Sequence, residues 1–256
     1  MSGMVYEEAR LVGSADIAEG MKRMTFLAPG IARRARPGQF VMVSTEARGT
    51  LLARPLGVSG ADPEDESLTL RFAVVGKGTS WLAERRNGDA VRMYGPLGHG
   101  FTTGAKDCVL IGGGTGLAPL FFLKEEIERE GGSALLLAGA KDRLCLMESD
   151  VLESGCVIAT EDGSLGERGL VTGPLRRLTA GRRFDMAYAC GPVPMLKAVK
   201  DACAQAGLPL EVSLETRMGC GVGACNGCTC DQAVKDGAWL KVCKDGPVFR
   251  AEEVLR

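Results

Sequence analysis

Three cysteines near the carboxyl end, Cys220, Cys225 and Cys228, have the spacing C-x4-C-x2-C, and 14 residues separate Cys228 from Cys243. Thiolates are the usual ligands of iron–sulfur clusters, and the first spacing is the plant-type pattern of a 2Fe–2S cluster. Glycine 219 precedes the first of these thiols, and glycines 221, 223 and 227 stand between them. A loop around a cluster brings backbone N–H groups close to sulfur, and side chains there would block the approach. The stretch therefore predicts a 2Fe–2S site with these four cysteines as metal ligands.

Structural zinc is the alternative metal for this stretch. Zinc sites prefer paired C-x2-C elements and usually recruit histidine. The sequence has a single C-x2-C pair, and its only histidine, His99, lies 121 residues before Cys220. These features favour iron–sulfur, and a colourless chain with bound zinc would contradict that interpretation. Cys230 is a surplus thiol, and the scattered cysteines are interpreted as small buried hydrophobes: Cys108, Cys145, Cys156, Cys190 and Cys203.

The composition is that of an ordinary globular protein of 256 residues, apart from its 36 glycines and 10 cysteines. Lys and Arg number 31 and Asp and Glu 32, so a surface for nucleic acid is not expected. The longest uncharged stretch, 108–123, has 16 residues and is too short to span a bilayer. The first ten residues carry acids where a signal peptide needs an apolar stretch. We expect a cytoplasmic protein without membrane or nucleic-acid partners, in which structural disulfides are not expected.

A glycine-rich stretch lies between a buried apolar segment, 107–111, and a helix that Pro119 opens. Its residues are Gly112, Gly113, Gly114, Thr115 and Gly116. A helix start offers free N–H groups and a positive dipole end, and glycine lets a pyrophosphate reach them. The standard dinucleotide fingerprint needs an acid about 20 residues further on. Asp142 stands 28 residues after Gly114, so the stretch has the form G-x-G-x-x-P instead, and a tight turn without a ligand is the alternative.

The elements that position these residues change character near residue 105. Before it, apolar or alternating runs at 37–45, 68–75 and 88–94 are separated by turn signals, which predicts a small antiparallel barrel or sandwich. After it, strand segments alternate with helical segments, which predicts a doubly wound parallel sheet. The strands expected in that sheet are 107–111, 133–140, 156–160, 184–190 and 209–214. The cluster segment follows the sheet.

Together these stretches resemble the ferredoxin–NADP reductase superfamily. The motif LETRMGCGVGACNGCTC…KVCKDGPVF is similar to that of the electron-transfer, iron–sulfur flavoprotein subunit of class 1B dihydroorotate dehydrogenases. Supporting stretches follow in the family's order along nearly the whole chain: ARPLGVS, VVGKGTSWL, YGPLGHGF, IGGGTGLAPL, TEDGSLGERGLVT and ACGPVPML. The resemblance implies an FAD-binding β-barrel domain over 1–103, an NAD-binding α/β domain over 104–214 and a 2Fe–2S domain over 215–256.

The resemblance also assigns cofactor residues. It implies that FAD contacts come from Arg54, Pro55, Leu56, Gly57, Arg71, Phe72, Ala73, Gly78 and Thr79. Arg54 would pair with the FAD pyrophosphate, because a guanidinium fork suits phosphate oxygens. The family often has serine or threonine where Gly57 stands, so a hydroxyl contact to the flavin is missing here.

For the nicotinamide nucleotide, the resemblance implies contacts from Gly112, Gly113, Gly114, Thr115, Gly116, Asp162 and Gly163. Cys190 matches a catalytic position that faces the nicotinamide, and a buried structural cysteine is the alternative. Lys141 and Arg143 could bind a 2′-phosphate, which would mean NADP, although ordinary surface charge is the more common role of such a pair. NAD is therefore expected as a diffusible co-substrate, with NADP left open.

The implied function is that of an oxidoreductase subunit in pyrimidine biosynthesis. Electrons would pass from the FMN of a dihydroorotate dehydrogenase catalytic subunit, through the 2Fe–2S cluster and FAD, to NAD. The chain is too short to add a dihydroorotate-oxidising barrel, so the expected partner is that FMN-containing subunit, in a heterotetramer with two copies of each chain. One alternative is the reductase subunit of an NADPH:ferredoxin oxidoreductase or sulfide dehydrogenase complex, some of which use an aspartate as a cluster ligand. A zinc-stabilised nucleotide-binding regulatory module is the other.

Overall fold

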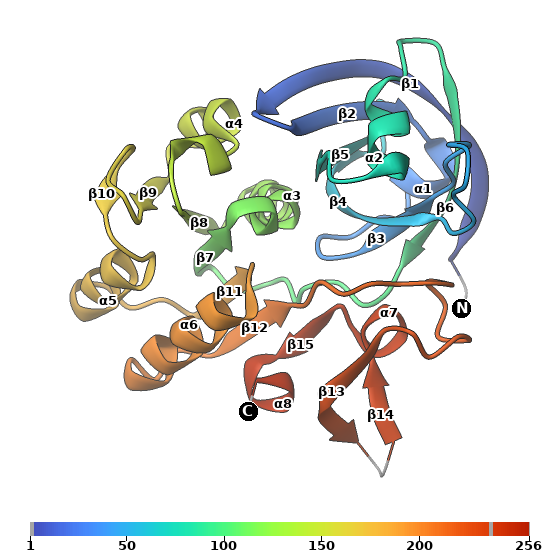
Figure 1. Cartoon of the computed structure of the whole chain (residues 1–256). Helices are drawn as coiled ribbons and strands as arrows, with labels where there is room; N and C mark the ends of the chain where they lie inside the picture. The colour runs from blue at the N-terminus through green and yellow to red at the C-terminus, as the bar shows by residue number, and fades with distance from the viewer. Residues whose placement is uncertain (1–2, 236–237, 256) are drawn as a thin grey trace.

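The first six strands close into an antiparallel barrel in the computed structural model, which describes residues 3–235 and 238–255 (Figure 1). Its strands, paired in the order β1-β2-β5-β4-β3-β6, are β1 (Val5–Ala18), β2 (Met21–Leu27), β3 (Phe40–Val43), β4 (Arg54–Asp62), β5 (Ser67–Ala73) and β6 (Ala90–Leu97). Two short helices, α1 (Pro29–Ala32) and α2 (Lys77–Ala83), lie in its connections. Along β5, Leu68, Leu70 and Phe72 are buried and alternate with less buried residues, as a strand with one core face requires. The predicted barrel is confirmed.

Seven strands form the second sheet, in the order β10-β9-β8-β7-β11-β12-β15. All of its pairings are parallel except that of β12 with β15. Its strands are β7 (Asp107–Gly113), β8 (Ser133–Ala140), β9 (Val157–Thr160), β10 (Glu167–Arg168), β11 (Met186–Cys190), β12 (Leu210–Ser213) and β15 (Val248–Arg250). The connections hold η1 (Gly114–Leu117), α3 (Ala118–Arg129), η2 (Arg143–Cys145), α4 (Glu148–Glu153), α5 (Thr172–Gly181) and α6 (Val193–Gln205).

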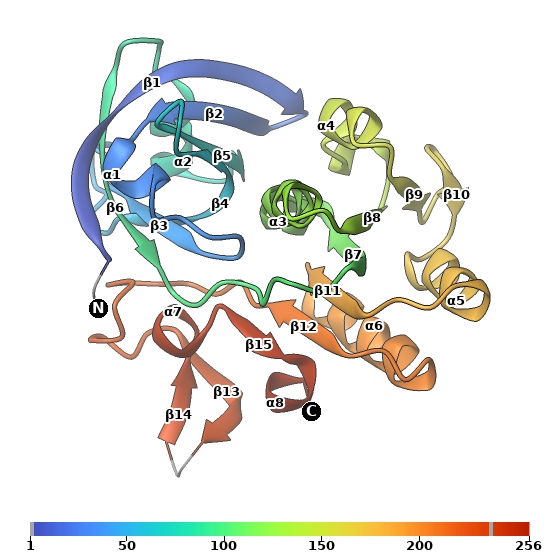
Figure 2. The ribbon, with the colours of Figure 1, turned by 180° about the vertical axis from the view of Figure 1, so that it is seen from behind.

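Helices cover both faces of this sheet. On β7, Val109 and Ile111 belong to the core that includes residues of α5 and α6, whereas Cys108 and Leu110 belong to the core that includes residues of α3 and α4. Figure 2 shows α3 and the α5–α6 pair on opposite sides of the row of central strands. The predicted doubly wound sheet is confirmed. Among the described residues, no helix has the length and apolar character needed to cross a membrane.

The carboxyl-terminal segment lies below both sheets in the view of Figure 1 and returns to the second one. It contains the hairpin β13 (Thr229–Lys235) and β14 (Ala238–Lys241), then α7 (Val242–Asp245), β15 and α8 (Ala251–Val254). In β15, Phe249 pairs with Val212 of β12, so this segment adds an edge strand that the sequence pattern did not predict. The division into units 1–103, 104–214 and 215–256 stays a prediction, and β15 ties the third unit to the second.

Candidate functional site

A cavity of about 450 Å³ lies between the barrel and the carboxyl ends of the parallel strands. Ten residues predicted to contact a cofactor line it: Arg54, Pro55, Leu56, Gly57, Arg71, Phe72, Ala73, Thr79, Thr115 and Cys190. They come from β4, β5, α2, η1 and the end of β11. Doubly wound sheets bind ligands beyond the carboxyl ends of their strands, and this volume is within the range of cofactor pockets. We refer to it as the interdomain cavity.

Arg54 presents a cation to the interdomain cavity because Gly78 leaves room for it. A Cβ atom at position 78 would come within 2.5 Å of the Arg54 Nε atom. The Arg54 guanidinium also donates a hydrogen bond to the Leu52 carbonyl, which holds its orientation. A planar guanidinium held in this way suits a pyrophosphate, as expected for Arg54.

Thr79 contributes to the same wall in a way the sequence did not indicate. Its hydroxyl oxygen accepts the backbone N–H groups of Val75 at 2.9 Å and Gly76 at 3.1 Å, and it donates to the Gly76 carbonyl at 3.1 Å. The hydroxyl therefore shapes the turn before α2.

Gly57 lies in the same cavity but has free space beside it. A Cβ atom at this position would meet no atom within 4 Å. A serine or threonine side chain at that position would project into open space.

Arg71 lines the cavity and ties the barrel to the second sheet. Its Nε atom donates to Asp150 of α4 at 2.6 Å, and its Nη1 atom donates to the Ser59 carbonyl at 2.9 Å. Arg23 of β2 pairs with the other carboxylate oxygen of Asp150, whose side chain is only 1% exposed. The Arg71 guanidinium also lies 4.6 Å from the centre of the Phe121 ring. Asp150 belongs to no motif, so sequence reasoning missed it.

The carboxyl ends of β11 and β12 supply the wall opposite the barrel. Cys190 pairs in register with Ser213, and Glu215 and Thr216 follow directly along the chain. Burial, together with the nearby Glu215 charge, raises the pKa of the fully buried Cys190 thiol, which therefore stays protonated. Glu215 lines the cavity and its side chain is exposed there. The surrounding protein atoms still remove part of the water from its carboxyl group, and this desolvation raises its pKa. Parallel strands end at one edge, so the position of Glu215 after the strand 209–214 was a signal that could have found it.

The glycine-rich loop serves packing as much as ligand access. A Cβ at Gly116 would lie 2.3 Å from the Cys190 carbonyl oxygen, and one at Gly113 would lie 2.5 Å from the Met195 sulfur. Gly114 differs, because its φ is +55° and its Cβ position has no atom within 4 Å. Gly114 is therefore the loop position at which a phosphate group could approach the backbone.

A second cavity, of about 390 Å³, opens on the other side of this loop. Its lining includes Gly113, Gly114, Gly139, Lys141, Cys145, Glu161, Thr172 and Met195. Asp162 and Gly163, which were predicted to contact the nucleotide, are not among its lining residues. The Asp162 carboxylate instead accepts the Ser164 hydroxyl at 2.6 Å and the Ser164 N–H at 2.9 Å, and these bonds lower its pKa. The contact of Asp162 and Gly163 with the nucleotide stays a prediction. Glu161 is the acidic residue that lines the second cavity.

The four predicted metal ligands lie beside the barrel as two neighbouring pairs, Cys220 with Cys225 and Cys228 with Cys243. The sulfur atoms of Cys228 and Cys243, both buried, lie 3.0 Å apart. Backbone N–H groups point at the thiols, from Gly223 to Cys243 at 3.1 Å and from Cys225 to Cys220 at 3.4 Å. Burial opposes ionisation of Cys220, but hydrogen bonds from nearby backbone N–H groups outweigh it and lower the pKa of this thiol to about 6.

Three of these thiols lie on one loop and Cys243 lies in α7, and this arrangement fits an iron–sulfur cluster. A Cβ at Gly219 would lie 3.1 Å from the Cys225 sulfur, and Gly221 and Gly223 have φ values of +68° and +80°. Within the described ranges, no three Cys, His, Asp or Glu side chains converge as ligands of a single ion do. A 2Fe–2S cluster needs thiolates on each of two irons, with N–H groups directed at sulfur, and the loop supplies both features.

The barrel holds this loop next to the interdomain cavity. The Tyr94 hydroxyl donates to the Cys220 carbonyl at 3.1 Å, and a Cβ at Gly221 would lie 2.7 Å from Cγ of Met42. Met218, two residues before Cys220, lines the interdomain cavity, and so does Pro247, four residues after Cys243. The thiol loop and the cavity therefore share a wall.

Comparison with known proteins agrees with this geometry. Residues 215–255 match the family model described as the iron–sulfur cluster binding domain of dihydroorotate dehydrogenase B. A dihydroorotate dehydrogenase B (NAD(+)) electron transfer subunit from Desulforamulus reducens is 41% identical, over 97% of each chain. One from Caldanaerobacter subterraneus subsp. tengcongensis is 37% identical, over 97% of this chain and 98% of the relative. The chain belongs to this family of electron transfer subunits.

The solved structures place the family in a wider fold. A chain of an NADH-dependent reduced ferredoxin-NADP oxidoreductase, described in connection with flavin-based electron bifurcation, matches with a TM-score of 0.85 and 31% identity, over 97% of this chain and 90% of that one. A ferredoxin NADP+ reductase from Neisseria gonorrhoeae shares the fold at a TM-score of 0.63 and 18% identity, over 83% and 94%. The identity to the two dihydroorotate dehydrogenase B subunits, 37% and 41%, is higher than that to either solved structure.

Proposed function

We propose that the chain binds FAD in the interdomain cavity and a 2Fe–2S cluster on Cys220, Cys225, Cys228 and Cys243, and that it carries electrons between a dihydroorotate dehydrogenase catalytic subunit and NAD. The wall that the cavity and the thiol loop share supports this most directly. Met218 and Pro247 line the cavity, and each lies within a few residues of a thiol ligand. A one-electron and a two-electron carrier must lie close together to exchange electrons. The shared wall supports the proposal that their two sites are neighbours.

Bound FAD and the cluster would supply the redox chemistry, and the residues of the chain would orient and insulate them. Arg54 would neutralise the pyrophosphate, while Leu56 and Phe72 would exclude water from the cavity. The buried, protonated Cys190 would offer an uncharged thiol at the strand edge, against which a nicotinamide ring could stack. The backbone N–H groups around the thiols would stabilise the negative charge of the cluster.

NAD fits the second cavity better than NADP. Glu161 places a carboxylate in its lining, which would accept hydrogen bonds from ribose hydroxyls and repel a 2′-phosphate. Lys141 lies in the same lining and provides a single counter-charge. Contacts of Gly112–Gly116, Asp162 and Gly163 with NAD remain part of this proposal.

The family name implies a second, catalytic subunit. We propose that this partner contains FMN, and that two copies of each chain form a heterotetramer. Co-purification tests the proposal: the chain is produced with its catalytic subunit, and iron, sulfide, zinc, flavins and the mass of the complex are measured. FAD and FMN together, with iron and sulfide in equal amounts, are expected. Zinc without flavin would contradict the proposal, and a second large flavoprotein as partner would indicate a different oxidoreductase complex.

A further inference from the structure

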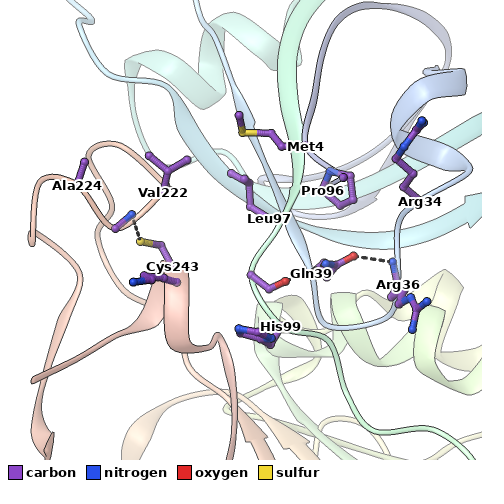
Figure 3. A pocket seen from close by; sticks show the side chains of 15 residues that line it. Met4, Arg34, Arg36, Gln39, Pro96, Leu97, His99, Val222, Ala224 and Cys243 are labelled. Atoms are coloured by element: carbon purple, nitrogen blue, oxygen red, sulfur yellow. Dashed lines mark hydrogen bonds between the residues drawn. The ribbon is translucent and has the colours of Figure 1, made fainter. Parts of the chain in front are cut away.

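One hydrogen bond to a ligand sulfur lies at the edge of a surface groove of about 720 Å³, between the barrel and the thiol loop. Gly223 and Cys243 both line this groove, and the Gly223 N–H donates to the Cys243 sulfur at 3.1 Å. In Figure 3 a dashed line joins this sulfur to the backbone between Val222 and Ala224. Water in the groove competes for an N–H group at its wall, so the bond depends on how firmly Gly223 is held.

Gly223 does little to hold its own conformation. Its φ is +80°, and glycine adopts φ values of either sign with similar ease. The residue lies in the stretch 214–228, which has no helix or strand. The Lys244 stem packs over it, since a Cβ atom at position 223 would lie 3.0 Å from Cδ of Lys244. The direction of the Gly223 N–H group must therefore be fixed by contacts from outside the loop.

Lys241 provides such a contact. Its Nζ atom donates a hydrogen bond to the Gly223 carbonyl at 3.1 Å, which holds the peptide group that follows Gly223. The peptide group that precedes Gly223 carries the N–H directed at Cys243. Both peptide groups that meet at this glycine are therefore engaged, one by the ammonium and the other by the ligand sulfur.

The backbone of Lys241 is itself well anchored. Lys241 is the last residue of β14 and pairs with Thr229 of β13. Its N–H donates to the Asp245 carboxylate at 2.7 Å, and the N–H of the next residue, Val242, donates to the Cys228 carbonyl at 2.9 Å. The side chain of Lys241 therefore reaches from a segment with regular pairing to a loop that has none.

Other cations lie near the same sulfur, and the proposed cluster is an anion that becomes more negative when it takes up an electron. Lys244, Arg34 and Arg36 line the groove. Within the part of the chain that the structure describes, none of these three side chains donates a hydrogen bond to the thiol loop. They act on the cluster through charge alone, whereas Lys241 also acts through the peptide that it holds.

We infer that Lys241 is a positioning residue for the cluster: by holding Gly223 it keeps an N–H group on the Cys243 sulfur and raises the reduction potential of the cluster. This inference rests on the proposed function, because it names a residue that tunes the proposed cluster. Hydrogen bonds to the sulfurs are among the features that set the potential of such clusters. A donor stabilises a sulfur more strongly when the extra electron is present, so loss of the bond favours the oxidised state.

Lys241→Met tests the inference, because methionine keeps an unbranched stem but donates no hydrogen bond. The full chain, loaded with FAD and cluster, is titrated with a reductant while the EPR signal of the reduced cluster is recorded. At a fixed potential we expect the ratio of reduced to oxidised cluster to fall about tenfold, which is about 59 mV for a one-electron couple. The flavin absorbance in the same sample should follow the wild type. Lys241→Arg keeps a cationic donor and should restore most of the shift.

Two control variants separate the hydrogen bond from charge. Lys244→Met removes a cation from the groove wall but keeps a stem over Gly223, and Lys244 is exposed. Because solvent and salt screen an exposed charge, we expect its ratio to change by about threefold or less. Lys106→Met removes the same kind of bond, from Nζ to the Glu130 carbonyl at 3.0 Å, just before β7. It should leave the potential of the cluster unchanged.

The outcomes distinguish this inference from the proposed function. A cluster in Lys241→Met that titrates like the wild type would overturn the inference alone, and so would equal shifts in Lys241→Met and Lys244→Met, which would indicate charge without positioning. If Lys241→Met loses its iron, Lys241→Gln replaces it, and hydrogen exchange over 221–224 should be faster in that variant than in Lys244→Met. Equal exchange in the two would also overturn the inference. Absence of a 2Fe–2S signal from the wild-type chain would contradict the proposed function itself.

Discussion

The interdomain cavity and the thiol loop lie side by side but are built by different means. The cavity is formed at the ends of regular strands, where Arg54, Arg71 and Cys190 are placed by β4, β5 and β11. The thiol loop lies between β12 and β13, with no helix or strand over 214–228. Its shape comes from glycines and from N–H groups directed at sulfur.

Different interactions hold the two sites in place. The cavity rests on packing that exists without its ligand, so single substitutions there should have graded effects. The loop has no helix or strand over 214–228, and metal binding contributes directly to the folding of such segments. Loss of one thiol should therefore remove the whole cluster and leave the cavity intact.

The largest expected effect comes from Cys228→Ser, which removes a buried thiol that we propose as a cluster ligand. We expect loss of iron and a fall of roughly 100-fold or more in NAD reduction by dihydroorotate. Substituting a residue that only hydrogen-bonds to a metal ligand already costs about 10–100-fold in metal affinity or activity. NADH-driven ferricyanide reduction should stay close to that of the wild type, because it needs only the cavity. Iron content and the two rates provide the measurement.

The control for this variant is Cys230→Ser, which changes the surplus thiol two residues away. It should keep its iron and both activities. Equal iron loss in the two variants would mean that Cys230 is a ligand and that the C-x4-C-x2-C assignment is wrong.

The next largest effect is expected for Asp150→Asn, which tests the rigidity of the cavity. It leaves Arg23 and Arg71 without their shared carboxylate at a position 1% exposed. Removing one partner of a buried pair costs about 3–5 kcal/mol, and we expect the lower end because Arg23 is 35% exposed. Denaturant unfolding measures the loss, and FAD retention should fall with it.

Glu46→Gln is the matched control for that variant. It breaks the pair with Arg92, in which both side chains are about half exposed or more, so it should cost less than about 1 kcal/mol. Similar losses from the two variants would show that Asp150 does not tie the barrel to the second sheet.

A smaller effect is expected for Gly116→Ala. Its Cβ would lie 2.3 Å from the Cys190 carbonyl oxygen, and overpacking of this kind costs about 1–3 kcal/mol. Gly173→Ala in α5 is the control, since its Cβ would meet only the end of Arg177 at 4.0 Å. Alanine is favoured over glycine in helices, so this control should gain about 0.5–1 kcal/mol. A neutral Gly116→Ala would contradict the close packing of the loop against β11.

The smallest expected effect is the pH dependence of stability that comes from Cys108, a buried thiol outside the loop. Burial, with help from the charges of Asp185 and Asp107, raises the pKa of Cys108 from 9.0 to about 11. The folded state thus favours the neutral thiol, and this contribution is present below pH 9 and is lost as the pH rises toward 11. Between about pH 8 and about pH 10 the loss is on the order of 1 kcal/mol.

Unfolding curves of the wild type and Cys108→Ala at the two pH values measure this term. The variant should lose less stability than the wild type over the interval. The same pH dependence in both proteins would show that Cys108 does not contribute it.

Much of this molecule could be predicted from local patterns. The alternation of buried and exposed residues over 68–75 depends only on near neighbours in sequence, and so does the alternation of strands and helices after residue 105. The barrel and the parallel sheet agree with these two patterns. The proposed ligand set rests on spacing, because one loop supplies three of its thiols. The three-residue strand β15 could not be predicted, since its residues pair with residues of β12 that lie 35 to 39 positions earlier along the chain.

Contacts between units also escaped sequence reasoning. Asp150 has no distinguishing neighbours, and its role depends on Arg23 and Arg71, which lie 127 and 79 residues away. The roles of Gly113 and Gly116 were predicted as ligand access, but their close neighbours are Met195 and the Cys190 carbonyl. Such roles arise from tertiary packing, which local sequence does not specify.

The central claim is that this chain links a dihydroorotate dehydrogenase catalytic subunit to NAD. The most direct test is anaerobic NADH formation from dihydroorotate by the catalytic subunit, with and without the FAD- and cluster-loaded chain. The account predicts NADH formation only when the chain is present, and its loss with Cys228→Ser. A loaded chain that binds the catalytic subunit but supports no dihydroorotate-dependent NADH formation would contradict the account.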